Sequence, residues 1–187
     1  MKIKKSIRRF GILMIGIVLL RGYLYRTIIQ YHKVGERKTI ELTNKDLIKE
    51  VENRIKNKKL NLEEIAAASQ EITKEHLRFT FQNTSQNPNI IYNTGKANCM
   101  GYSSLCNSIA NYIITKQQEK SKYVAKNIYG KLELFGVDLN GLFKSKFYET
   151  HDYNQFLDLE TKRCILTDPS VGDYLKIDRV SSSGCSQ

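Results

Sequence analysis

The chain has 187 residues, with 30 Lys and Arg against 19 Asp and Glu, and a formal net charge of +11. This length suffices for one ordinary hydrophobic core, which predicts a single domain. Residues 1–38 carry ten basic side chains and one acidic side chain, a net +9, so the remainder carries only +2. Because phosphate binding needs cations clustered on the folded face, we expect no nucleic-acid partner.

The four cysteines show neither a CxxC pair nor a metal-ligand spacing with the three histidines. This pattern predicts no metal site, and no other cofactor signature is visible. Four cysteines are too few for a disulfide scaffold in a chain of this length, although one bridge is compatible with the sequence.

The N-terminal segment has the layout of a membrane-targeting sequence. A basic run, Lys2 to Arg9, precedes eleven apolar residues, Phe10 to Leu20, and the bulky residues after Arg21 offer no small-residue cleavage site. A spanning helix needs about 20 apolar residues, so eleven is short unless Arg21 reaches the interface and the segment extends to residue 25. We expect residues 1–38 to be a basic leader with a signal-anchor at 10–20, or to 25 if so extended. The domain is then membrane-anchored or exported, on the extracytoplasmic side.

Helices are predicted in the first half of the remaining chain. The first covers residues 43–59, where apolar side chains recur at helical spacing and Thr43 or Asn44 can cap it. A second begins after Asn61. Residues 81–98, rich in Asn, Ser, Thr, Gly and Pro, predict a loop around a short apolar piece at 90–92. A third helix begins near Cys99 and continues to about Thr115.

Strands are predicted in the second half, at 123–129, 132–137, 141–148 and 163–167, where β-forming residues occur in short runs. Helices followed by strands favour an α+β fold with an antiparallel sheet packed on the Cys99 helix. We place this domain at residues 39–180 and a disordered tail at 181–187.

Cys99 lies where a loop containing Gly95 runs into a helix. The unpaired amides and the dipole of a helix start favour a thiolate, and the same amides can hold an oxyanion. Asn98 or Asn93 can add a side-chain donor, and the sequence selects neither. Taken alone, a cysteine is more often a small buried hydrophobe.

Two downstream residues complete a candidate triad. His151 lies in an aromatic stretch that can be extended, and Asp168 ends the apolar strand at 163–167, just before Pro169. If the two segments pair as a hairpin, the carboxylate of Asp168 can orient the imidazole toward Cys99. Each residue also has a structural explanation: His151 can be a core histidine with its hydrogen bonds satisfied, and Asp168 can be a cap at the end of a strand. The order Cys99, His151, Asp168 along the chain favours catalysis.

This arrangement resembles the transglutaminase-like superfamily of papain-like thiol enzymes. The resemblance rests on Cys99-Met-Gly-Tyr with its helix, on an isolated histidine in a strand, and on Leu166-Thr-Asp-Pro169, over roughly residues 90–175. It implies a papain/transglutaminase-like core with Cys99 as nucleophile, His151 as general base and acid, and Asp168 as orienting carboxylate. Members often carry an aromatic residue two positions after the histidine, where this chain has Tyr153, and a tryptophan before the aspartate, which this chain lacks.

The expected function is that of a thiol hydrolase or acyltransferase that attacks amide or peptide carbonyls through an acyl-enzyme on Cys99. A protease or amidase acting on a protein or peptide is favoured over a cross-linking transglutaminase. The alternative, favoured by the missing aromatic positions, is a catalytically inactive transglutaminase-like interaction module at the cell envelope. The sequence leaves the oligomeric state open.

The other polar and thiol candidates have structural interpretations. Cys106 is on nearly the same helix face two turns after Cys99, and Cys164 lies inside an apolar strand, so both are expected in the core. His76 is expected to be solvated or to cap its helix. Asp152 adjoins His151 but points to the opposite face of a strand, which makes it a poor orienter. Gly172-Asp173 is expected to form a turn.

Overall fold

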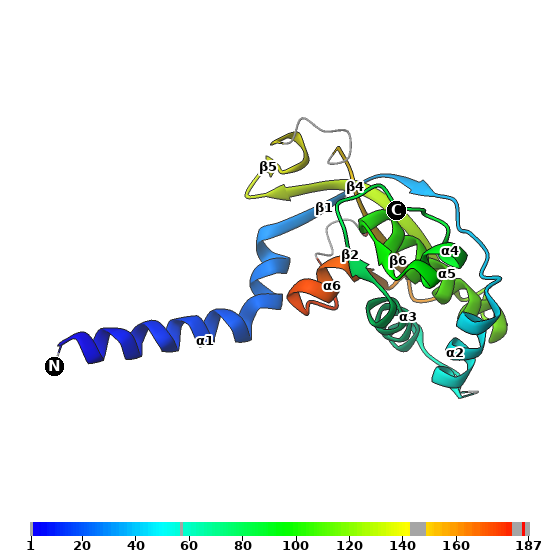
Figure 1. The fold of residues 1–187 in the computed structure, drawn as a ribbon, viewed down its shortest axis with the longest axis horizontal. Helices are drawn as coiled ribbons and strands as arrows, with labels where there is room; N and C mark the ends of the chain where they lie inside the picture. The colour runs from blue at the N-terminus through cyan, green and yellow to red at the C-terminus, as the bar shows by residue number, and fades with distance from the viewer. Residues whose placement is uncertain (1, 57, 143–148, 181–184, 186–187) are drawn as a thin grey trace.

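The computed structural model describes residues 2–56, 58–142, 149–180 and 185. Within these ranges the helices are α1 (Lys2–Ile28), α2 (Lys45–Ile55), α3 (Leu62–His76), α4 (Pro88–Thr94), α5 (Cys99–Lys116) and α6 (Pro169–Leu175), with a 3-10 turn η1 at Asn140–Leu142. The strands are β1 (Ile29–Arg37), β2 (Arg78–Phe79), β3 (Lys96–Ala97), β4 (Tyr123–Leu134), β5 (Val137–Asp138), β6 (His151–Asp158) and β7 (Cys164–Thr167). Figure 1 shows their arrangement.

The main sheet has the strand order β1-β4-β6-β7, with β5 paired to the far end of β4, and every pairing is antiparallel. The expected α+β class and antiparallel sheet are therefore confirmed. The hairpin between β6 and β7 is also as predicted, with Asn154 opposite Thr167 and Phe156 opposite Ile165. Strands β2 and β3 form a separate parallel pair.

Helix α5 packs on the sheet and lies in the middle of the larger core. Its apolar residues Leu105, Ile109 and Ile113 are fully buried among side chains from α2, α3, β4 and β6. The other face of the sheet has a smaller cluster that contains Tyr31, Ile128, Tyr153, Leu166 and Val180. The sheet is thus covered on both faces, and Cys99, the first residue of α5, is held at one end of this packed helix.

The predicted helix starts are confirmed. Asn44, rather than Thr43, caps α2 by accepting from the backbone N–H groups of Asp46 and Leu47. Asn61 caps α3 with a reciprocal capping box, in which Glu64 bonds back to the backbone of Asn61. The buried apolar residues of both helices belong to the same core as those of α5.

The prediction of a plain loop over residues 81–98 is wrong in part, because it contains α4. Asn87 caps this helix, Pro88 occupies its first turn, and Gly95 ends it with φ of +65°. These are the start and stop signals of a short helix, which the polar composition of the segment obscures.

The predicted strands at 123–129 and 132–137 form one long strand, β4, with a tight turn to β5. Within this strand, Gly130 leaves room for β1, because a Cβ at this position would lie only 2.3 Å from the carbonyl oxygen of His32. The predicted strand at 141–148 is wrong in its first two residues, because Gly141 and Leu142 belong to η1. Residues 143–148 lie outside the described residues. The expected turn at Gly172-Asp173 is part of α6.

Residues 1–38, predicted as a leader, divide into a helix and a strand of the domain itself. Helix α1 extends away from the body (Figure 1), and β1 follows it directly and pairs with β4 along its whole length. The expected membrane-spanning segment is not supported: within the described residues no helix is long and apolar enough to cross a bilayer, because charged residues bound the eleven-residue apolar run.

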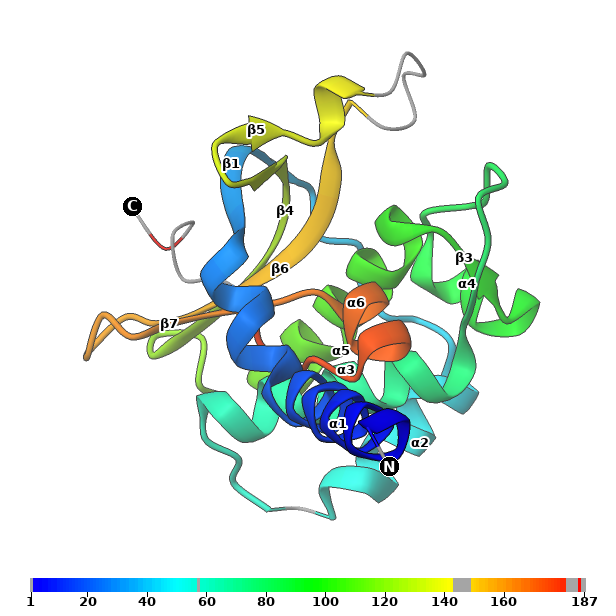
Figure 2. The same ribbon diagram turned by 90° about the vertical axis from the view of Figure 1, so that its left-hand side faces the viewer.

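The C-terminal half of α1 is tied to the domain. The side chain of Arg21 donates to the backbone oxygens of Leu175 (2.8 Å) and Lys176 (3.4 Å) at the end of α6, and the two helices lie side by side in Figure 2. Of the predicted disordered tail, residues 181–184, 186 and 187 lie outside the described residues.

Candidate active site

Cys99 is the first residue of α5, as predicted, and it is 7% exposed. Asn98 caps this helix, and its side-chain oxygen accepts from the backbone N–H of Gly101 at 3.2 Å. Its amide nitrogen Nδ2 is buried, with no hydrogen-bond partner among the described residues. Asn93 lies in α4, where its side chain accepts from Asn44 at 3.4 Å. Of the two asparagines considered, only Asn98 directly precedes Cys99 in the chain.

His151 begins β6, and its ring interacts with both of the other predicted residues. The ring nitrogen Nε2 is 2.5 Å from Oδ2 of Asp168, and Cys99 lies close enough to the ring to raise its pKa. Because Nε2 is engaged by the carboxylate, Nδ1 is the nitrogen left for the thiol. The side chain of His151 is 18% exposed, so a substrate can reach the ring while most of it is shielded.

Asp168 follows β7 and is fully buried. Its Oδ1 caps α6 by accepting from the backbone N–H groups of Ser170 and Val171, both at 3.1 Å, and from the Ser170 hydroxyl at 2.6 Å. Oδ2 faces His151. Asp168 therefore fits both interpretations of it. One carboxylate oxygen forms the cap at the strand end, and the other is in position to orient the imidazole.

The electrostatics favour a charged imidazole beside a charged carboxylate. Burial alone would lower the pKa of His151, but Asp168 and the sulfur of Cys99 raise this pKa well above its ordinary value. Burial alone would raise the pKa of Asp168, but His151 and the donors of the α6 cap hold it below its ordinary value. The pair is thus arranged to keep a proton on the imidazole.

Sequence reasoning did not identify Tyr31, which also contacts Asp168. Its hydroxyl donates to Oδ2 at 2.9 Å, and it is 2.7 Å from the hydroxyl of Tyr25 on α1. Burial and the nearby carboxylate raise the pKa of Tyr31 well above its ordinary value, so its proton is retained. The sequence carries no local signal for this contact, because Tyr31 lies 137 residues before Asp168.

A second charged pair lies close to Cys99. Arg37 of β1 binds the buried carboxylate of Asp152 through two nitrogens, at 3.0 Å for the longer contact. The Asp152 hydrogen bond raises the pKa of Arg37, and the charge of Cys99 contributes in the same direction. Asp152 therefore binds a guanidinium and does not orient His151, as predicted.

A scan of protein-family models and searches of curated proteins and of solved structures found no match to this chain.

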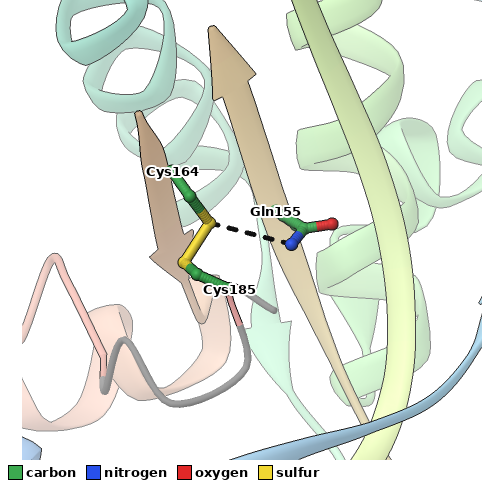
Figure 3. The surroundings of a disulfide bond; sticks show 3 residues. All are labelled: Gln155, Cys164 and Cys185. Carbon is green, nitrogen blue, oxygen red and sulfur yellow. Dashed lines mark hydrogen bonds between the residues drawn. A yellow bond between two sulfur atoms is a disulfide. The ribbon is translucent and has the colours of Figure 1, made fainter. Parts of the chain in front are cut away.

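The remaining cysteines differ from one another. Cys106 is fully buried in the core, as expected, and burial raises its pKa to about 12. The expectation that Cys164 is a core residue needs correction, because it forms a disulfide with Cys185 (Figure 3). The Nε2 group of Gln155 lies 3.7 Å from the Cys164 sulfur. The sequence could not pair these residues because Cys185 lies in a polar tail with no periodic pattern.

His76 is not simply solvated. Its Nε2 lies 2.7 Å from a carboxylate oxygen of Glu50, and its ring packs against that of Tyr92 with centroids 4.6 Å apart. These contacts tie α3 to α2 and α4, and the structure places His76 with neither Cys99 nor Asp168.

Proposed function

We propose that this protein is a thiol hydrolase or acyltransferase acting on amide or peptide carbonyls, with a papain/transglutaminase-like core. The proposal rests on one observation: Cys99, at the start of α5, lies close enough to the imidazole of His151 to raise its pKa, and Asp168 binds Nε2 of the same imidazole at 2.5 Å. A nucleophile, a base and an orienting group in contact are the arrangement that covalent catalysis requires. The closeness of the three residues supports the proposal of an enzyme over that of an inactive interaction module.

In the proposed first step, the Cys99 thiolate, whose proton His151 already holds as the charged imidazole, attacks the carbonyl carbon. A carbon–sulfur bond forms while the carbonyl π electrons move to the oxygen, which the N–H groups at the start of α5 can stabilise. The oxyanion then collapses, the carbon–nitrogen bond breaks, and His151 gives its proton to the departing amine. The product is a thioester on Cys99.

In the second step, water or an amine attacks the thioester while His151 accepts the proton of the incoming nucleophile. The carbon–sulfur bond breaks and the sulfur leaves with its electron pair, which regenerates Cys99. Water gives a protease or amidase, and an amine gives a cross-link. Asp168 orients the imidazole and stabilises its positive form in both steps.

The proposed location is an oxidising compartment, on the exported side of a membrane. The disulfide between Cys164 and Cys185 supports it, because such bonds persist outside the reducing cytosol. The exposed apolar side chains of α1, such as Leu19 at 75% and Ile15 at 61%, support contact of this helix with a membrane surface. Recovery of a tagged protein in the soluble cytoplasm, with both cysteines reduced, would contradict this location.

Thiol labelling tests the catalytic proposal. Wild-type protein, kept oxidised so that Cys164 and Cys185 stay paired, is treated with an iodoacetamide probe, and the modified residue is identified by mass spectrometry. We expect rapid labelling at Cys99, loss of labelling in Cys99→Ala, and unchanged labelling in the control Cys106→Ala, because Cys106 is fully buried. Labelling of Cys99→Ala as strong as that of wild type would refute the assignment of the reactive thiol.

Labelling alone does not separate an enzyme from a module that carries a reactive thiol. Incubation of wild-type protein with a mixture of peptide amides, followed by intact-mass measurement after an acid quench, should trap a thioester on Cys99. Addition of an amine to the same reaction distinguishes transfer from hydrolysis. If Cys99 is labelled by iodoacetamide but no peptide amide yields either a thioester or a cleaved product, the interaction module is the better description.

A further inference from the structure

An apolar pocket of about 380 Å³ opens beside His151. This volume lies within the range of sites that bind small ligands or single large side chains. Its lining includes side chains from the segment after α3, from the start of β6 and from α6: Phe79, Phe81, His151, Val171, Tyr174 and Leu175.

Aromatic rings form much of the pocket wall. The ring of Phe79 packs edge-on against Phe81, with centroids 5.0 Å apart, and against Tyr174 at 5.5 Å. Although they lie in this cluster, Phe81 is 69% exposed and Tyr174 is 59% exposed. Large apolar side chains gathered around a hollow and left exposed are typical of a binding surface.

The elements that carry the triad also build this pocket. Phe79 packs on Tyr102, with centroids 6.2 Å apart, and Tyr102 lies one turn after Cys99 on α5. The Tyr102 hydroxyl donates to Asp173 on α6 at 2.8 Å, which ties α5 to the helix that Asp168 caps. A group held in the pocket therefore touches His151, the residue proposed to act with Cys99.

We propose that this pocket binds an aromatic or long aliphatic side chain of the substrate, adjacent to the carbonyl that Cys99 attacks. The inference rests on the proposed function and names its substrate class. The pocket has no lysine, arginine, aspartate or glutamate among its lining residues, and the imidazole of His151 is already paired with Asp168, so a charged side chain would lose hydration there and gain little in return. An apolar side chain gains by leaving water.

Dipeptide chloromethyl ketones can test this inference. The thiolate of Cys99 attacks the methylene carbon, a carbon–sulfur bond forms, and chloride leaves with the bonding electrons. The probes are acetyl-Phe-Gly and acetyl-Gly-Phe chloromethyl ketone, each compared with the same probe carrying Ser in place of Phe. Iodoacetamide, which has no side chain to bind, reports the reactivity of Cys99 alone.

For at least one probe position, we expect the Phe compound to modify wild-type protein about tenfold faster than its Ser counterpart, or more. Phe81→Ser and Tyr174→Ser should bring this ratio close to one while the iodoacetamide rate stays unchanged. Phe135→Ser is the matched control, because Phe135 is a 79% exposed aromatic at the turn between β4 and β5 and does not line the pocket.

Two failures can be told apart. Absence of iodoacetamide labelling at Cys99 in wild type would refute the proposed function and, with it, the proposed role of the pocket. Normal iodoacetamide labelling with equal Phe and Ser rates at both positions would overturn only the pocket. A third outcome is that the wild type is a dimer, that Phe81→Ser converts it to a monomer, and that the Phe and Ser probes react at equal rates. This outcome would assign the pocket to a second copy of the chain and would also overturn the inference.

Discussion

Two buried carboxylates near the start of β6 have partners of different chemistry. Asp168 binds His151, an imidazole that can lose its proton, whereas Asp152 binds Arg37, a guanidinium that stays charged at any accessible pH. Both carboxylates are almost completely shielded from water. Burial alone therefore does not make a carboxylate part of a reactive site: a partner that exchanges protons allows proton transfer, and a permanently charged partner stabilises the structure.

The largest expected effect is on turnover, in Asp168→Asn. The α6 cap needs an oxygen at the Oδ1 position, so the new amide group points at His151 and Tyr31, which are both donors. The imidazole then loses its charge partner and takes the wrong tautomer. We expect the turnover of a peptide amide to fall by about a thousandfold or more, measured as kcat/KM.

Asp152→Asn serves as the control for that measurement, because it removes an equally buried carboxylate that does not face His151. We expect its turnover to stay within about tenfold of wild type. Equal losses in the two variants would break the distinction between the carboxylates and assign both to the reaction.

The next largest effect is on stability, in Arg37→Gln. This change leaves the carboxylate of Asp152 buried without its cation, and a buried charge that loses its partner costs about 3 kcal/mol of unfolding free energy. Urea denaturation measures the loss. Lys126→Gln, which removes an exposed partner of Glu36, is the matched control and should cost much less. A loss in Arg37→Gln no greater than in the control would contradict the structural importance of this pair.

The stability conferred by the two carboxylates should also differ in its dependence on pH. The raised pKa of His151 contributes stability that is complete below its ordinary value of 6.5 and is lost as pH rises through the raised value. The lowered pKa of Asp168 contributes stability above its ordinary value of 3.8, lost as pH falls through the lowered value. The difference in unfolding free energy between wild type and Asp168→Asn should therefore be largest between these two values and shrink at alkaline pH.

The same denaturation series with Arg37→Gln should show a difference from wild type that stays constant on the alkaline side, because a guanidinium does not titrate there. A difference for Asp168→Asn that is equally constant from about pH 6 to about pH 10 would show that His151 is not the titrating partner.

Local patterns predicted much of the fold and the three candidate residues. The caps at Asn44 and Asn61, the helix from Cys99 and the hairpin that joins β6 to β7 all follow from short-range signals in the chain. The hairpin then brings Asp168 to His151, because both lie at the same end of two paired strands.

Contacts between distant segments could not be predicted in the same way. The strand β1 could not be predicted from its own residues, because it lies in a basic segment that has the layout of a leader. Its place in the sheet depends on pairing with β4, about a hundred residues away. The disulfide joins β7 to a polar tail. Tyr31 reaches Asp168 only because β1 lies in the sheet, so the site has a contributor that no pattern around Cys99, His151 or Asp168 could indicate.

The smallest predicted effect concerns that contributor. Tyr31→Phe removes one of the two donors to Oδ2 of Asp168 and keeps the ring. With less of its charge satisfied, the carboxylate holds the proton of His151 more strongly, which raises the pKa of the imidazole. We expect turnover to change by less than about tenfold and the alkaline limb of the pH–rate profile to move to higher pH. Tyr153→Phe is the matched control, since its buried hydroxyl has no hydrogen-bond partner among the described residues and its loss should leave the profile in place. If both variants shifted the limb equally, the effect would come from altered packing, and Tyr31 would have no positioning role through Asp168.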